Sequence, residues 1–95
     1  MELFDDSEMT TLYESTRDAE SEPCEVRFDG GTLVVSYQSV VYKGSAIGEG
    51  HWELRCAEND GKASLHQFPG GRFLEGFWQE GGLQGMWRIG LGKSA

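Results

Sequence analysis

The sequence predicts a mostly β protein, an antiparallel meander of about seven short strands that forms a small, partly open barrel or curled sheet. From Cys24 onward, apolar and polar residues alternate with a period of two, as they do in strands with one buried face. Asp-Gly and Gly-Gly pairs separate the alternating runs at short intervals. The length of 95 residues allows one domain with a thin core.

Residues 1–23 are predicted to form an acidic N-terminal arm, followed by a single β domain over residues 24–95. The arm has eight acidic side chains and one base, Arg17, whereas the rest of the chain is almost neutral. A short helix is expected within the arm, since Ser7 is a suitable N-cap. Residues recur at helical spacing after this cap, at Met9, Leu12, Tyr13 and Thr16. The alternative is a disordered acidic tail. Deleting residues 1–20 is expected to leave the sheet folded, unless the arm is a helix that covers the core, in which case stability is expected to fall clearly.

The expected strands follow one another as hairpins. Their sequences are EVRF, TLVVSY, SVVYKG, HWELRC, KASLHQF, RFLEGFWQE and LQGMWRIGL. The turns between them are expected at Asp29-Gly30-Gly31, Asp60-Gly61, Pro69-Gly70-Gly71 and Gly81-Gly82.

A two-residue turn at Gly81-Gly82 fixes the register of the last hairpin. Trp78 then faces Gly85, and Trp87 faces Gly76. Glycine leaves an empty place on a sheet that a cross-strand aromatic side chain covers, which explains why the two residue types alternate here. The same register pairs Leu74 with Ile89, Glu75 with Arg88, and Phe77 with Met86.

The two preceding turns extend the register to four strands. Phe68 is expected to face Phe73, His66 to face Glu75, and Arg55 to face His66. One face of this sheet then carries the tryptophans and aliphatic side chains and forms the core. The opposite face, called face two below, contains one row that reads Arg55–His66–Glu75–Arg88.

Face two is the candidate binding surface, because a merely solvated face seldom holds three phenylalanines and a methionine. Its predicted partner- or ligand-binding residues are Arg55, His66, Phe68, Phe73, Glu75, Phe77, Met86 and Arg88. Aromatic residues, Met and Arg are favoured in interfaces. The sequence therefore predicts a non-catalytic protein–protein interaction module, such as a small regulator, inhibitor or adaptor. The acidic arm is expected to bind or steer a partner with a basic surface. The alternative is a lipocalin-like barrel in which face two lines a small-ligand pocket.

Other functions find little support in the sequence. The net charge of −8 opposes direct nucleic-acid binding and attachment to anionic membranes. No catalytic motif, metal-ligand pattern or cofactor motif is recognisable, so neither an enzyme nor a metal or cofactor site is expected. His51 and His66 share a face with Glu53 and Glu75, and simple cross-strand pairing accounts for them. No apolar signal sequence begins the chain, which favours a cytoplasmic location, where two cysteines are expected as buried free thiols.

The stretch from residue 74 to residue 87 also has a family resemblance. Leu74-x-Gly76-x-Trp78-x-x-Gly81-x-x-x-Gly85 resembles one MORN repeat, whose pattern begins Tyr-x-Gly-x-Trp-x-x-Gly-x-x-x-Gly. Leu74 replaces the usual tyrosine, and a tryptophan stands at position 87 where the family has a further glycine. The resemblance covers about a dozen residues of the 95 and implies a non-catalytic module that binds proteins or lipids. The acidic balance of the chain favours proteins.

Overall fold

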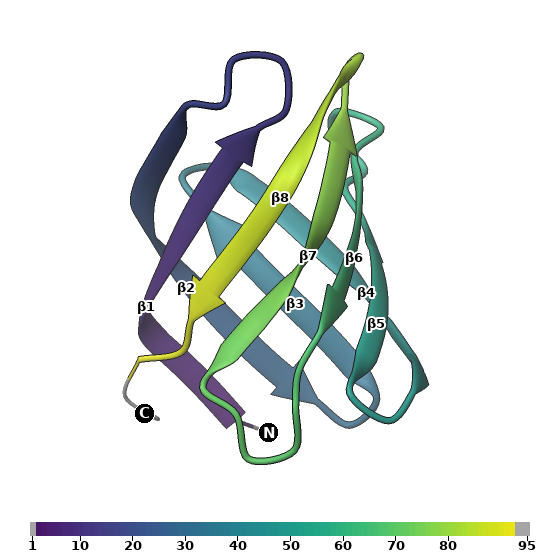
Figure 1. Cartoon of the computed structure of the whole chain (residues 1–95). Helices are drawn as coiled ribbons and strands as arrows, with labels where there is room; N and C mark the ends of the chain where they lie inside the picture. Colours follow the sequence, from purple (N-terminus) through teal and green to yellow (C-terminus); the bar gives the residue numbers. More distant parts are fainter. Residues whose placement is uncertain (1, 93–95) are drawn as a thin grey trace.

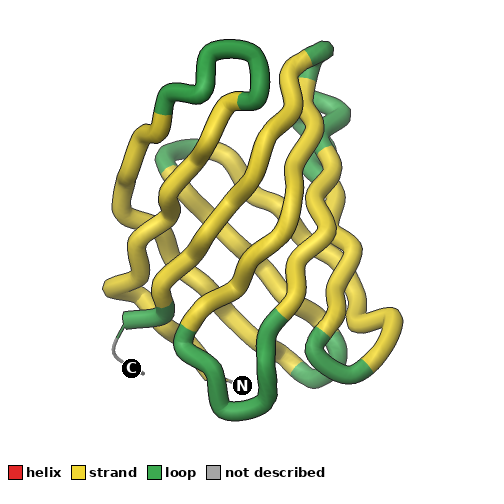
Figure 2. Tube along the Cα trace, viewed as in Figure 1, coloured by secondary structure: helices red, strands yellow, loops and turns green. Residues whose placement is uncertain are grey.

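The computed structural model describes residues 2–92, which form a closed barrel of antiparallel strands (Figure 1). Each strand pairs with the next along the chain, and the last pairs with the first. Figure 2 shows that strands joined by short loops make up the whole described part of the chain, which has no helix. The strands are β1 (Glu2–Tyr13), β2 (Ala19–Asp29), β3 (Thr32–Tyr37), β4 (Val40–Gly48), β5 (His51–Arg55), β6 (Lys62–His66), β7 (Phe73–Glu80) and β8 (Leu83–Gly90).

The predicted antiparallel β barrel is therefore confirmed, with two differences in detail. The barrel has eight strands instead of about seven, and it is closed instead of partly open. Both differences arise from β1, which hydrogen-bonds to β2 on one side and to β8 on the other. The N-terminal residues thus supply the strand that removes both open edges of the sheet.

The short helix predicted in the acidic arm is wrong, and so is the alternative of a disordered tail. The inward-facing residues of β1 include Met9, which is fully buried, and the polar residues Ser7 and Thr11, which are also buried. Ser7 is satisfied at this site: its hydroxyl donates to the Phe4 carbonyl and accepts from the Gly92 amide, each at 3.0 Å. Polar residues at inward positions, and a bulge between Phe4 and Ser7, hide the alternating pattern of a strand.

Side chains fill the interior of the barrel, as expected for eight strands. Trp78 and Trp87 stack with their ring centroids 6.3 Å apart, and the Tyr42 ring meets Trp87 edge-on at 4.9 Å. Burial at roughly 25 cal/mol per Å² of apolar area makes these rings the largest contributors to the core. The remaining core residues are Met9, Cys24, Val26, Leu33, Val35, Leu54, Cys56, Ala63, Leu65, Leu74, Ile89 and Leu91.

The predicted register of the last two hairpins is confirmed. All five pairs proposed for β7 and β8 are observed, including the two tryptophan–glycine pairs, and His66 pairs with Glu75 between β6 and β7. Phe68 and Phe73 do not form a ladder pair, because β6 ends at His66 and β7 begins at Phe73.

The predicted pairing of Arg55 with His66 is wrong. In the structure Arg55 pairs with Lys62, and His66 pairs with His51. The cause is the connection between β5 and β6, which is a six-residue loop over residues 56–61 instead of a two-residue turn. The Asn59 side chain accepts a hydrogen bond from the Gly61 amide at 2.9 Å and stabilises this loop. The register moves by an even number of residues, so each side chain keeps its predicted face.

The main reason why glycine stands opposite each tryptophan differs from the predicted one. A Cβ atom on Gly76 would collide with the Ser64 carbonyl of β6, and one on Gly85 with the Leu12 carbonyl of β1. Trp78 is a further contact for Gly85, 3.2 Å from the position of that Cβ. Glycine is thus required at both positions because the neighbouring strand on the other side approaches closely in the coiled barrel wall.

Candidate functional site

Face two lies on the outside of the barrel. Phe68 is 82% exposed, Phe77 60%, Met86 46% and Phe73 44%. Arg55, His66, Glu75 and Arg88 are also exposed. The predicted alternative of a pocket enclosed by face two is therefore not what the structure contains, because these side chains point to solvent and core residues fill the interior.

Three exposed apolar side chains lie next to one another across β7, β8 and β1. Phe77 pairs with Met86, and Met86 pairs with Leu12, which is 40% exposed. We call Leu12, Phe77 and Met86 the apolar row. The sequence prediction contained Phe77 and Met86 but missed Leu12, because it placed Leu12 on a helix. The closure of the barrel by β1 is what completes the row.

A groove of about 710 Å³ runs along the apolar row. The loop between β1 and β2 contributes Glu14 and Arg17 at one side, while β5 and β6 contribute Arg55 and Lys62 at the other. Polar side chains of β7 and β8 also line the groove, at Gln79 and Gln84, and β5 adds the carboxylate of Glu53. The groove is thus an apolar strip with charged borders, which is the usual anatomy of a protein interface.

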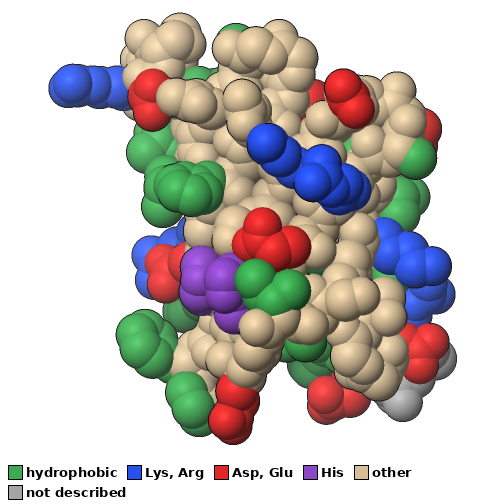
Figure 3. Space-filling view, turned by 90° about the vertical axis from the view of Figure 1, so that its right-hand side faces the viewer, with side chains coloured by type: hydrophobic (Ala, Val, Ile, Leu, Met, Phe, Trp, Pro, Cys, Tyr) green, Lys and Arg blue, Asp and Glu red, His purple; other side chains and the backbone are tan. Residues whose placement is uncertain are grey.

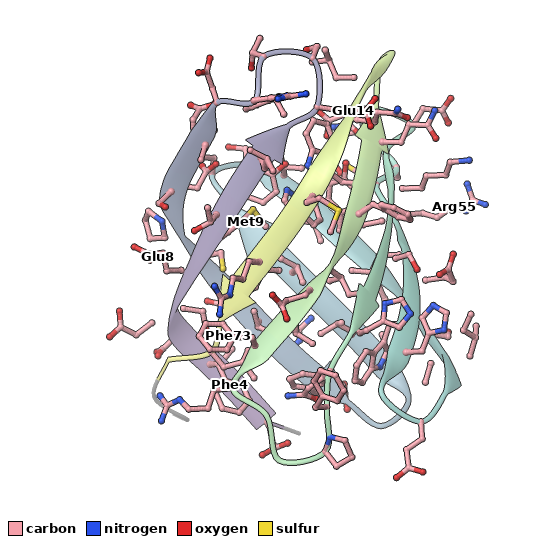
Figure 4. All side chains as sticks on the ribbon, viewed as in Figure 1. Phe4, Glu8, Met9, Glu14, Arg55 and Phe73 are labelled. Atoms are coloured by element: carbon pink, nitrogen blue, oxygen red, sulfur yellow. The ribbon has the colours of Figure 1, made fainter. Side chains whose placement is uncertain are left out.

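Basic side chains form a second row beside the apolar one. Lys43 of β4 pairs with Arg55 of β5, and Arg55 pairs with Lys62 of β6. We call these three residues the cationic row. Figure 4 shows Arg55 projecting away from the barrel, and Figure 3 shows basic side chains next to one another on this side of the molecule. The sequence prediction identified Arg55 alone, because the incorrect register of β5 and β6 placed His66 opposite it.

The other predicted residues make contacts with one another, apart from the groove. The imidazole rings of His51 and His66 stack with their centroids 4.0 Å apart. Arg88 Nε lies 3.4 Å from Glu75 Oε2, and its guanidinium lies over the Phe73 ring, 4.2 Å from the centroid. These side chains form one cross-strand row in the order His51, His66, Glu75 and Arg88. The structure therefore divides the predicted site into a groove, this mixed row and Phe68, which lies in the loop between β6 and β7.

Carboxylates beside the groove already have partners. Glu53 is hydrogen-bonded to Ser64 and, at 3.0 Å, to His51 Nε2. The hydrogen bond from Ser64 is the largest cause that lowers the pKa of Glu53. Glu14 accepts a 2.8 Å hydrogen bond from Gln84 Nε2. Arg55 and Lys62, in contrast, have no carboxylate within 4.0 Å among residues 2–92.

Among residues 2–92, no three His, Cys, Asp or Glu side chains are grouped as a metal site. Cys24 and Cys56 are buried free thiols, as predicted, and burial raises the pKa of Cys24 to about 12. Across the same residues, no helix is long and apolar enough to cross a membrane.

Comparison of the chain with protein-family models, with curated proteins and with solved structures found no match. The resemblance of residues 74–87 to one MORN repeat therefore stays a prediction.

Proposed function

We propose that the chain is a non-catalytic protein-binding module, a small regulator, inhibitor or adaptor, that docks a partner on the outer groove. The observation that carries this proposal is the apolar row. Phe77, Met86 and Leu12 are each at least 40% exposed, yet they lie side by side in register on three strands. A contiguous exposed apolar patch with a polar border is typical of an interaction site.

The residue types of the groove suit a binding role. Phe77 offers a large rigid ring, and aromatic residues supply much of the affinity at interface centres. Met86 is flexible and adapts to the shape of a partner. Arg55 at the border provides directional hydrogen bonds that orient the bound partner.

The scaffold also suits a binding role. All three members of the apolar row lie on strands that hydrogen-bond to neighbours on both sides. Their backbone is therefore fixed before binding, which lowers the entropy lost when a partner docks. Binding surfaces built on regular elements are more precise than those built on loops.

Charge is separated along the chain in a way that favours one orientation of a partner. Residues 2–23, which span β1, the loop after it and the start of β2, contain eight of the sixteen acidic side chains. We propose that this acidic surface steers a partner that has a basic region outside the groove. The direct contacts are then made at the groove itself.

A photo-crosslinking experiment tests the proposed function. Benzoylphenylalanine replaces Phe77 in one variant and Phe68 in another, and each is irradiated in an extract of the source organism. Both positions are exposed phenylalanines, but only Phe77 borders the groove. We expect a discrete protein adduct from position 77 that is absent or much weaker from position 68. Equal adduct patterns at both positions would show that the groove has no special role.

A further inference from the structure

The cationic row is unusual for the protein that contains it. Lys43, Arg55 and Lys62 lie directly opposite one another on three adjacent strands, where like charges destabilise a sheet. The chain has sixteen acidic residues and eight basic ones, so acids to neutralise the row are abundant. Within the described residues, however, the two ion pairs are His51–Glu53 and Glu75–Arg88, and neither involves the row. The stability of the fold therefore does not explain why three basic side chains face one another here.

The cationic row borders the apolar row. Lys62 lies two residues before Ser64, which pairs directly with Phe77. Arg55 and Lys62 line the same groove as Phe77 and Met86. The two carboxylates of that groove, on Glu14 and Glu53, already accept hydrogen bonds from neighbouring side chains. The lining of the groove also includes Arg17, so three cationic side chains stand against these two carboxylates and the net charge of the lining is positive.

We propose that the groove binds an acidic segment of a partner protein, with carboxylates on the cationic row and an adjacent large apolar side chain on the apolar row. This inference rests on the proposed function and specifies the chemistry of the partner. Lysine and arginine attract carboxylates, and arginine binds them in a bidentate geometry. Phe77 and Met86 supply the apolar contact that fixes the segment in place.

An acidic protein segment fits the observations better than a nucleic acid or a membrane. The cationic row spans only three strands, whereas the whole chain has a net charge of −8. A long polyanion or an anionic bilayer extends beyond the row and meets the acidic remainder of the surface. A short segment places its carboxylates on the row and avoids that repulsion.

Selection from a displayed library of random peptides tests the inference on the full chain. We expect peptides enriched by the wild type to contain Asp or Glu next to a large apolar residue. Their affinity, measured by fluorescence anisotropy, should fall roughly tenfold or more in the Lys43→Gln/Arg55→Gln/Lys62→Gln variant. Added salt should also lower the affinity of these peptides, since it screens exposed charges. Arg27→Gln is the control for the loss of a basic side chain elsewhere on the barrel and should leave peptide affinity unchanged, because Arg27 is an exposed base on β2 outside the groove.

A stability measurement separates a binding role from a structural one. Neutralising the cationic row removes like-charge repulsion, so the triple variant should melt at the wild-type temperature or above it. Weaker peptide binding at unchanged or higher stability supports the inference. A triple variant that melts clearly lower would show that the row serves the fold, and the inference would fail.

The remaining outcomes distinguish this inference from the proposed function. Peptides that depend on Phe77 but bind the triple variant as tightly as the wild type would overturn the acidic segment and leave protein binding in place. A selection that enriches no peptide would also overturn the acidic segment. The proposed function is tested separately, by crosslinking from position 77. A labelled single-stranded oligonucleotide or an anionic vesicle is tested in the same way. If either binds more tightly than the peptides and through the same cations, the ligand is another polyanion and the acidic protein segment is overturned.

Discussion

The Tyr42 hydroxyl donates a 2.6 Å hydrogen bond to Glu80 Oε1, which joins β4 to β7 across the inside of the barrel. Two strands separate these residues around the wall, so no backbone pairing connects them. Glycine at position 61, in the loop between β5 and β6, leaves room for this contact, because a Cβ atom there would collide with the Tyr42 hydroxyl. The bond therefore ties together the wall at this end of the barrel.

Tyr42→Phe should lower the free energy of unfolding by about 1–2 kcal/mol, because it removes a hydrogen bond to a carboxylate. Urea denaturation of Tyr42→Phe, Glu80→Ala and the double variant completes a double-mutant cycle. We expect a coupling energy of about 0.5–1.5 kcal/mol. Additive effects of the two substitutions would show that the bond contributes nothing.

The role of β1 is tested by two adjacent residues with opposite orientations. Met9 is fully buried in the core, whereas Glu8 is exposed. Met9→Ala should destabilise the fold by about 2–5 kcal/mol, and Glu8→Ala should change it by less than about 0.5 kcal/mol. Thermal melts of both variants provide the comparison. Similar small effects in both would place β1 outside the core, as the sequence prediction did.

The close approach of neighbouring strands is tested by Gly85→Ala. The added methyl group meets the Leu12 carbonyl of β1, a backbone atom that cannot rotate away. We expect a loss of more than about 1 kcal/mol, as in other cases of overpacking. Gly31→Ala is the control, since nothing lies within 4 Å of its added Cβ. Equal free energies of unfolding in urea for both alanine variants would contradict the close approach of β1 to Gly85.

Stability should fall at alkaline pH. Burial raises the pKa of Cys24 from an ordinary 9.0 to about 12, and it also raises the pKa values of Tyr37 and Tyr42. Between the unfolded and folded pKa values, the unfolded chain has lost protons that the folded chain retains. The free energy of unfolding should therefore be unaffected by these groups below about pH 9 and decrease above it.

Urea denaturation from about pH 7 to pH 11 checks this dependence. Cys24→Ala removes one of these three groups and should reduce the slope while leaving the part due to the tyrosines. A wild-type slope of zero up to about pH 11 would contradict the burial of these groups.

The sequence was sufficient for the strands that end in two-residue turns. Gly81-Gly82 fixed the register of β7 and β8, so the pairs Trp78–Gly85 and Phe77–Met86 were predicted correctly. It was insufficient where a side chain determines the loop. Asn59 and Gly61 stabilise a six-residue connection, and Asp60 adopts a positive φ of 62° within it, which an Asp-Gly pair alone does not indicate.

The candidate site was predicted in part for the same reasons. Even register shifts preserve faces, so the outward orientation of Phe77, Met86 and Arg55 was correct. The apolar row could not be completed from sequence, because Leu12 matched a helical spacing and the inward neighbour Thr11 is polar. The cationic row was missed because the pairing of Arg55 with Lys62 depends on the length of the loop.

Phe77 and Trp78 are adjacent on β7 but are 60% and 5% exposed, so one points into the groove and the other into the core. The melting temperature and the affinity for the partner identified by crosslinking at position 77 are measured for Phe77→Ala and Trp78→Ala. We predict that Phe77→Ala weakens the binding free energy by roughly 2 kcal/mol or more, while its melting temperature stays close to that of the wild type. Trp78→Ala should lose about 3–5 kcal/mol of stability. Unchanged affinity of Phe77→Ala for this partner, or unfolding as severe as that of Trp78→Ala, would contradict the account.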